Sequence, residues 1–179
     1  MDNVSCYQIS SFFNQFYSHR FYTTVVQLSE KQIRLNHWFL TGFIDGEGCF
    51  SIDIAKSKVN KIGWQVKLRF SIGLHKKDQA ILKYIQIYLG VGHIYKQGLN
   101  SVRFVIQSIE DLTKITEHLD LFPLFTEKRR DYELFKIALS IMQKNEHLTV
   151  DGLKKIVALK LSINWGKISP HLEDAPRFS

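Results

Sequence analysis

The 179-residue chain is poor in several features, and each shortage argues against a class of protein. It has only 3 prolines but 13% aromatic residues, so it can bury enough apolar surface to offset the entropy of ordering, unlike a disordered tail or a low-complexity linker. Its two cysteines, Cys6 and Cys49, lie far apart without companion ligands at zinc-site spacing, and we interpret them as reduced thiols. No apolar run reaches the roughly 18 residues of a membrane span, so we expect no membrane partner.

The residues that are present indicate one basic globular domain with extensions. The chain is 45% hydrophobic, and its 24 Lys and Arg against 17 Asp and Glu give a formal charge of +7. This charge favours a polyanionic partner without identifying it. Residues 1–31 contain neither a secretory hydrophobic segment nor the arginine density of a transit peptide. We therefore expect an extension of unknown role over 1–31, a domain over 32–165 and a tail over 166–179.

The spacing of apolar residues predicts helices and strands in a repeating order. Helical spacing predicts a first helix over about 33–45, with Gly48 as its stop, and a second over 78–89, with Asp78 as its N-cap. Strict alternation predicts strands. The further elements predicted are strands over 49–54, 64–72, 93–96 and 101–108, and helices over 109–119, 127–145 and 150–163.

This order repeats a helix-strand-strand unit, which predicts an α+β fold. Its four strands can form one antiparallel sheet with helices on a single face and additional C-terminal helices. The face left bare fits a groove of duplex DNA, although exposed faces of antiparallel sheets are ordinarily polar and merely solvated. Alternation places on it Ser51, Asp53, Gln65, Lys67, Arg69, Ser71, Ser101, Arg103 and Gln107.

The segment LTGFIDGEG, Leu40 to Gly48, has two features that are unusual in a helix. Gly42 and Gly46 share one helical face, where each glycine costs about 1 kcal/mol relative to alanine, and a close helix-to-helix contact would compensate. Asp45 and Glu47 stand at the helix C-terminus, where acids are disfavoured. A hard cation such as Mg²⁺ or Ca²⁺, which prefers carboxylate and carbonyl oxygens, would reverse that penalty; the alternative is a solvated turn.

The segment LTGFIDGEGCFSI resembles the defining motif of the LAGLIDADG homing endonucleases, and Leu40 to Gly48 match all nine motif positions in character. The resemblance continues through WQVKLRFSIGLHKKD, LGVGHIY, NSVRFVI, FPLFTEKRRDYELF and HLTVDGLKKIVALK, and covers roughly 35–165. It implies an αββαββα core whose motif helices pair across a twofold axis, with sheets lying along the major groove. It also implies an interface between motif helices made by Gly42, Gly46, Phe39 and Phe43.

The resemblance further implies that Glu47 binds a catalytic Mg²⁺ or other divalent cation, with the Gly46 carbonyl as a second ligand. Such a cation would activate water and stabilise the leaving oxygen. Homologous enzymes also order water in a basic or polar pocket, for which the nearest candidates are Gln65, His75, Lys76 and Lys128. We assign Gln65 and Lys128 to catalysis with Glu47, and add Lys76 to the DNA-binding set. Trp38 and Phe39 are interpreted as core residues, and His118 and His147 as structural ones.

Because the chain contains one such motif, the resemblance implies a homodimer that cuts a near-palindromic double-stranded site during intron homing. The part from HLTVDG onward resembles the C-terminal end of two-motif members, so a complementary half is an alternative partner. Two rival functions stay open: an RNA maturase that assists splicing of its intron, and a DNA-binding module in which Glu47→Gln changes no activity. The resemblance implies a mitochondrial location, with the chloroplast as an alternative.

Overall fold

The computed structural model describes residues 35–163 of the chain. The extension over 1–31, the tail over 166–179 and both ends of the domain predicted over 32–165 fall outside these described residues. The order of elements is the predicted one. The elements are α3 (His37–Glu47), β1 (Gly48–Lys56), β2 (Trp64–His75), η1 (Lys76–Asp78), α4 (Gln79–Leu89), β3 (His93–Gln97), β4 (Ser101–Ile106), α5 (Ile109–Leu121), α6 (Lys128–Gln143), η2 (Glu146–Leu148) and α7 (Val150–Ser162).

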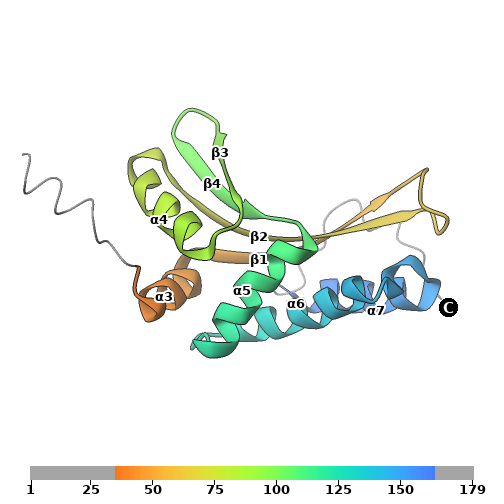
Figure 1. The fold of residues 1–179 in the computed structure, drawn as a ribbon. Helices are drawn as coiled ribbons and strands as arrows, with labels where there is room; N and C mark the ends of the chain where they lie inside the picture. Colours follow the sequence, from red (N-terminus) through yellow and green to blue (C-terminus); the bar gives the residue numbers. More distant parts are fainter. Residues whose placement is uncertain (1–34, 164–179) are drawn as a thin grey trace, which may run out of the picture. The chain divides into compact units, whose positions relative to one another are not determined.

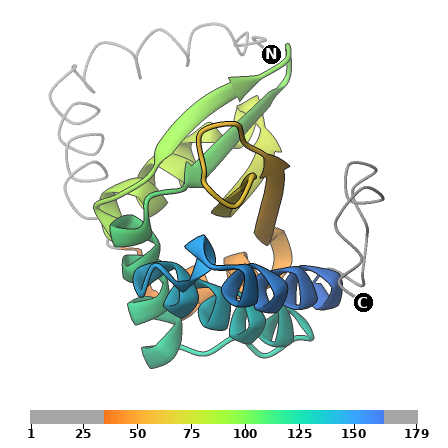
Figure 2. The same ribbon diagram turned by 90° about the vertical axis from the view of Figure 1, so that its right-hand side faces the viewer.

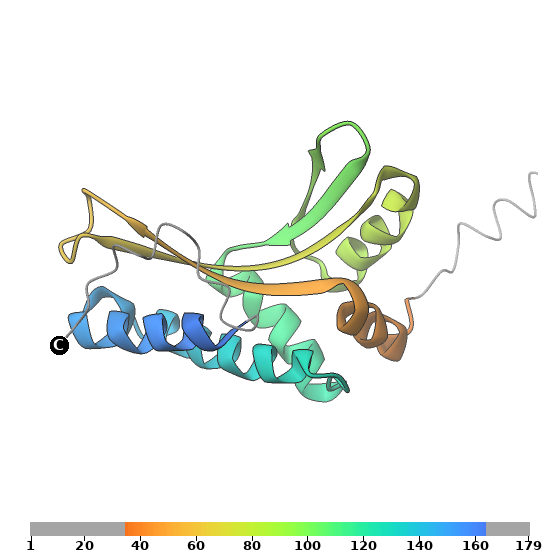
Figure 3. The same ribbon diagram turned by 180° about the vertical axis from the view of Figure 1, so that it is seen from behind.

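The four strands form one antiparallel sheet in the order β1-β2-β4-β3. Figures 1 and 3 show that the sheet bends, with the helices on its convex side, and that no described helix covers its concave side. Figure 2 shows α6 and α7 side by side beneath the sheet. The predicted α+β class, with helices on one face and additional C-terminal helices, is confirmed.

The core lies between the convex face of the sheet and the helices. Phe50, Phe70 and Phe104 from the strands and Phe135 from α6 are at most 1% exposed. The rings of Phe50 and Phe135 pack with their centroids 5.2 Å apart. Large aromatic side chains carry much of the burial energy of a core this size, so these contacts hold α6 against the sheet. No helix within 35–163 is long and apolar enough to cross a membrane.

Local capping explains where the helices begin. The side chain of Asn36 accepts hydrogen bonds from the amides of Trp38 and Phe39, so α3 begins at His37 and the predicted start near residue 33 is wrong. Asp78 precedes α4 as predicted, but its side chain makes no capping bond. The His75 side chain instead accepts from the Lys77 amide and opens the turn η1.

Gly48 ends α3 for a steric reason. Its φ is −70°, so it does not use the left-handed conformation that favours glycine at many helix ends. A Cβ atom at this position would lie 2.7 Å from the Ile44 carbonyl oxygen and 2.8 Å from its side chain. Gly48 is therefore the residue that lets the chain pass directly from the motif helix into β1, which fixes where Glu47 stands relative to the sheet.

Candidate functional site

The C-terminus of α3 meets the N-terminus of α6. The Lys128 ammonium, on the first residue of α6, donates to the carbonyl oxygens of Ile44, Asp45 and Gly46 at 3.0, 2.7 and 3.1 Å. These carbonyls carry the negative end of the helix dipole, which a cation stabilises. Burial lowers the pKa of Lys128, and the nearby acidic groups of Asp45 and Glu47 oppose that shift. The structure thus brings two predicted site residues, Gly46 and Lys128, into direct contact.

Asp45 is bound to the loop that precedes α6. Its carboxylate accepts a hydrogen bond from the Phe125 amide at 2.8 Å and another from the Thr126 hydroxyl at 2.7 Å. Together with Lys128 these bonds form a reciprocal clasp, in which each helix end binds a side chain from the other. Asp45 therefore positions the site, and its oxygens are already engaged.

Glu47, two residues further on, has a different environment. Its side chain is exposed, and among residues 35–163 no hydrogen bond or ion pair engages its carboxylate. It lies close enough to Lys128 for its charge to act on that ammonium. Of the two acids of the motif, Glu47 is thus the one whose oxygens are available to a ligand.

The donor chemistry at this helix end fits a hard divalent cation in part. Glu47 offers a free carboxylate, and the Gly46 carbonyl keeps a second lone pair beside the one that accepts from Lys128. No group of three His, Cys, Asp or Glu side chains within 35–163 could hold a metal by itself. A cation here would need further oxygens from a bound phosphate, from water or from a second protein module.

The concave face of the sheet begins beside this helix end. It carries the predicted polar and basic side chains Ser51, Asp53, Gln65, Lys67, Arg69, Ser101 and Arg103. Two members of the predicted set differ. Ser71 is only 7% exposed, because it is a short side chain on a central strand between Cys49 and Val105. Gln107 is exposed but lies one residue beyond the end of β4.

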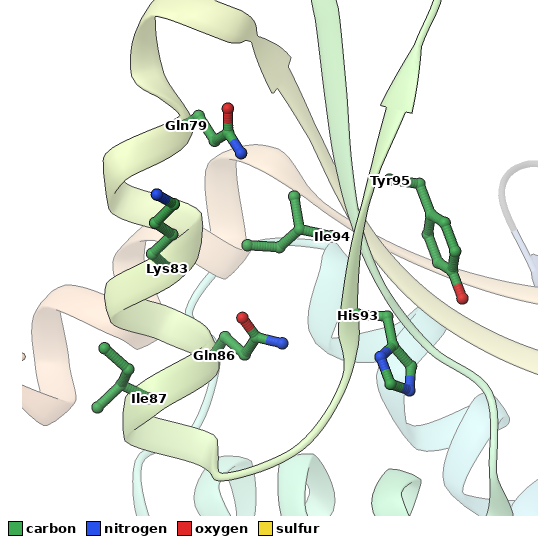
Figure 4. Close-up of a pocket in the computed structure, with 7 residues that line it drawn as sticks. All are labelled: Gln79, Lys83, Gln86, Ile87, His93, Ile94 and Tyr95. Atoms are coloured by element: carbon green, nitrogen blue, oxygen red, sulfur yellow. The ribbon is translucent and has the colours of Figure 1, made fainter.

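Strand β3 adds three side chains that the sequence-based set left out: His93, Tyr95 and Gln97. Their partners in the register are Val105, Arg103 and Ser101 on β4. Figure 4 shows His93 and Tyr95 pointing away from α4, while Ile94 points toward it across a pocket that Gln79, Lys83, Gln86 and Ile87 also line. The alternation around Ile94 was the signal that could have identified them.

The register separates Gln65 from Glu47. Gly48, which follows Glu47, pairs with Ile72, whereas Gln65 pairs with Ala55 near the far end of the β1–β2 hairpin. That is about 23 Å along the strand at the usual rise per residue. The assignment of Gln65 to catalysis beside Glu47 of the same chain is therefore wrong, although Gln65 does lie on the concave face.

His75 and Lys76 lie at the other end of β2, the end nearer to Glu47: His75 is three residues beyond Ile72, the partner of Gly48, which is about 10 Å along the strand. His75 pairs with Ser101 and caps η1, and the Lys76 amide donates to the Asn100 carbonyl. Both residues are exposed and stand beside the β3–β4 hairpin. Of the four candidates for the water-ordering pocket, Lys128 is the one whose side chain hydrogen-bonds to the motif helix.

The exposed face of α3 carries the residues predicted at a helix interface. Gly42 and Gly46 are exposed, and a Cβ atom on either would meet nothing within 4 Å in the described chain. Phe39 is 47% exposed and stacks on Phe43 with centroids 5.9 Å apart. Trp38 is 49% exposed, so the interpretation of Trp38 and Phe39 as core residues is wrong.

A buried polar network on the other face of α3 anchors the helix to α4 and α5. The His118 ring is hydrogen-bonded to two hydroxyls: Nδ1 lies 3.1 Å from that of Tyr88, and Nε2 lies 3.2 Å from that of Thr41. The Thr41 hydroxyl also donates to the Phe122 carbonyl. Burial, followed by the nearby His37, lowers the pKa of His118 to about 4. The predicted structural role of His118 is consistent with this environment.

Comparison with known proteins gives a family match and named relatives. Residues 40–139 match the family model described as LAGLIDADG endonuclease. The chain is 43% identical over 136 residues to "Probable intron-encoded endonuclease 3" of Neurospora crassa, covering 75% of this chain and 26% of that protein. It is 44% identical over 117 residues to "Uncharacterized 50.9 kDa protein in ND4 intron 1" of Podospora anserina, covering 64% and 26%. The chain thus spans about a quarter of the length of these relatives.

Solved structures share the fold at substantial sequence identity. The LAGLIDADG meganuclease I-CpaMI bound to uncleaved DNA has a TM-score of 0.75 and 47% identity, covering 79% of this chain and 48% of that one. I-SmaMI bound to an uncleaved DNA target in the presence of calcium ions has a TM-score of 0.76 and 42% identity, covering 80% and 50%. The homing endonuclease I-TnaI has a TM-score of 0.72 and 32% identity, covering 78% and 92%.

Proposed function

The chain belongs to the LAGLIDADG endonuclease family, and on this premise we propose that it is one module of a site-specific endonuclease that hydrolyses both strands of DNA with Mg²⁺. The observation that carries the proposal is the contrast between the two acids of the motif. Asp45 is fully engaged by the loop before α6, whereas Glu47 presents a free carboxylate next to the Lys128 ammonium and the concave face.

Glu47 and the Gly46 carbonyl are the groups that would hold the cation. When bound, a divalent cation activates water and stabilises the leaving 3′ oxygen of the scissile phosphate. Lys128 places its side-chain nitrogen at this helix end, where a phosphate must approach two acidic residues. The clasp between α3 and α6 holds these groups in place before DNA arrives, so little reorganisation is needed on binding.

The DNA would lie along the concave face. Lys67, Arg69 and Arg103 supply positive charge there, and the serine, glutamine and tyrosine side chains supply hydrogen-bonding groups about two residues apart. Side chains of this kind, carried on strands, can reach base edges in the major groove. The structures of I-CpaMI and I-SmaMI in complex with DNA support this choice of substrate.

Double-strand cutting needs a second module, and we propose that another copy of this chain supplies it. A single chain offers one Glu47, and the exposed stripe of Gly42 and Gly46 on α3 leaves open space where a second backbone could approach closely. A homodimer would recognise a near-palindromic site. The 92% coverage of I-TnaI supports a module of this size, while the 48% coverage of I-CpaMI makes a complementary half the alternative.

The setting of the activity follows from the relatives. Their names place them in introns, including an ND4 intron and cox1 introns of fungi. Because ND4 and cox1 are mitochondrial genes, we propose that this chain acts in intron homing in mitochondria. Insertion of its own coding intron into an intron-free copy of the target gene is the outcome that a homing assay would detect.

Glu47→Gln tests the proposal. The variant should bind a selected DNA site as the wild type does but should lose Mg²⁺-dependent cutting of a plasmid that carries the site, because the amide is neutral and a poor ligand for a hard cation. Glu117→Gln, on the exposed surface of α5, is the matched control and should cut normally. Cutting by Glu47→Gln at the wild-type rate would refute the metal-binding role.

A further inference from the structure

An acidic side chain stands on the face that should approach the phosphates of DNA. Among the described residues, Asp53 is the only acid that the four strands contribute. Its side chain is 45% exposed, so burial does not remove it from an approaching ligand. A free carboxylate there would repel DNA and weaken binding. Its ion-pair partner on β2 indicates a different role for this carboxylate.

Asp53 has two basic neighbours on β2, and its ion pair forms with the one that is not its partner in the strand register. Lys67 lies directly opposite Asp53, and Arg69 lies opposite Ser51, one step along the diagonal. The ion pair forms with Arg69, whose Nη2 atom is 2.8 Å from Oδ2 of Asp53. No hydrogen bond or ion pair engages Lys67 within 35–163. Asp53 therefore binds the planar guanidinium of Arg69, whose geometry suits a carboxylate, and not the ammonium of Lys67.

The ion pair uses only one of the N–H donors of Arg69. Its Nε atom is buried without a partner among the described residues, and one N–H of Nη2 is used by Asp53. The two N–H groups of Nη1 and the second one of Nη2 remain. A pair of N–H donors from one guanidinium matches the O6 and N7 acceptors that guanine presents in the major groove. A guanidinium held in one orientation also loses less rotamer freedom on binding.

Arg103 offers a contrast on the same face. It pairs with Gly73 on β2, six residues along that strand from Lys67, the partner of Asp53, and a Cβ atom at Gly73 would be 3.8 Å from its Nε. No acid pairs with Arg103 within 35–163. Its Nε atom is buried without a partner among the described residues, as that of Arg69 is, but no carboxylate there holds its guanidinium.

We propose that Asp53 is a positioning residue that determines specificity. It holds the Arg69 guanidinium in one orientation, so that Arg69 contacts a guanine-containing base pair instead of a phosphate. The inference rests on the proposed DNA-binding function of the concave face. It adds a role for an acid that direct DNA contact does not explain. Asp53 contributes little to total affinity and much to discrimination.

The test compares sequence preference and affinity in the full chain. Duplexes bound by the wild type are selected from a random library, and binding to single-base-pair variants of the selected site is then measured for wild type, Asp53→Ala, Arg69→Ala and the double variant. Glu117→Ala, which removes an acid from an exposed pair on α5, is the matched control. Circular dichroism of each variant checks that the sheet still forms.

Asp53→Ala should bind the selected site within a few-fold of the wild type but lose about tenfold of its discrimination at one base pair. Arg69→Ala should lose preference at that same base pair, and the double variant should lose no more than Arg69→Ala. Restoration of the preference by Asp53→Glu would support a positioning role. Glu117→Ala should behave as the wild type.

Undiminished discrimination by Asp53→Ala would overturn the inference. So would loss of preference at different base pairs in Asp53→Ala and Arg69→Ala, because Asp53 would then read a base by itself. A wild type that enriches no sequence would instead refute the proposed DNA-binding function, and this inference with it. The first two results leave that function intact, so the two kinds of failure are distinguishable.

Discussion

Replacing Lys128 with methionine removes the ammonium from the C-terminus of α3. The methionine side chain is about as long as the apolar stem of lysine. The change leaves the carbonyls of Ile44, Asp45 and Gly46 without the donor that now binds all three. Methionine can fill the space of the lysine stem, so the loss of the charge and of its hydrogen bonds is the main effect. Folding stability and metal-dependent activity should therefore both change.

The expected loss of stability can be estimated from the contacts. A hydrogen bond to a charged group contributes about 1.5–3 kcal/mol, but the three bonds share one ammonium and its end is partly solvated, so they do not add. A cation at a helix C-terminus contributes about 0.3–2 kcal/mol, which overlaps with the same bonds. We expect Lys128→Met to lower the free energy of unfolding by about 2 kcal/mol, or Tm by roughly 4–8 °C in a domain of this size.

Urea and thermal unfolding at neutral pH measure this loss, with Lys136→Met as the control. Lys136 lies on the same helix and pairs with Asp120, but the two side chains are 42% and 45% exposed, and such pairs contribute at most about 1 kcal/mol. A loss for Lys128→Met no larger than that of the control would refute the clasp between α3 and α6. DNA cutting should fall in Lys128→Met and persist in Lys136→Met.

Two further predictions concern α3 and its anchor. Gly42→Ala should leave the monomer as stable as the wild type, or more stable by up to about 1 kcal/mol, because the new Cβ atom meets nothing within the described chain. The same substitution should weaken the dimer, as measured by sedimentation or light scattering. A tight dimer of Gly42→Leu would contradict the proposed interface. His118 has a pKa of about 4 against the ordinary 6.5, so the unfolded chain binds more protons in that range. Stability should be full above pH 6.5 and fall by up to about 3 kcal/mol toward pH 4, and His118→Gln should flatten this slope in unfolding measurements while the exposed control His93→Gln should not.

The order and type of the elements could be predicted because periodicity reports which side chains are buried. Phe50, Ile52 and Ile54 alternate with polar residues, and that pattern can be satisfied only by a strand with one face in a core. The start of α3 was predicted wrongly, because apolar spacing continues before it while the Asn36 side chain sets the actual boundary. Capping depends on a local hydrogen bond that periodicity does not report.

The alternation of residues correctly predicted which side chains of β1, β2 and β4 share the concave face, but it left out those of β3. Alternation identified Asp53, Arg69 and Arg103, but it could not show that Ser71 is buried among its cross-strand neighbours. It also did not predict the ion pair between Asp53 and Arg69, since Lys67 is the closer partner in register. Which pairs form across strands depends on side-chain geometry that a linear pattern does not contain.

The sequence by itself determined the element order, the bare polar face and the position of two acids at the end of a helix, because each follows from neighbours a few residues apart. Only the tertiary structure decided which acid is free. The loop that engages Asp45 and the lysine that binds the Gly46 carbonyl lie about 80 residues further along the chain. It likewise removed Gln65 from the site, because strand register sets a distance that chain order does not. Contacts between distant segments arise from packing, so only the folded chain contains them.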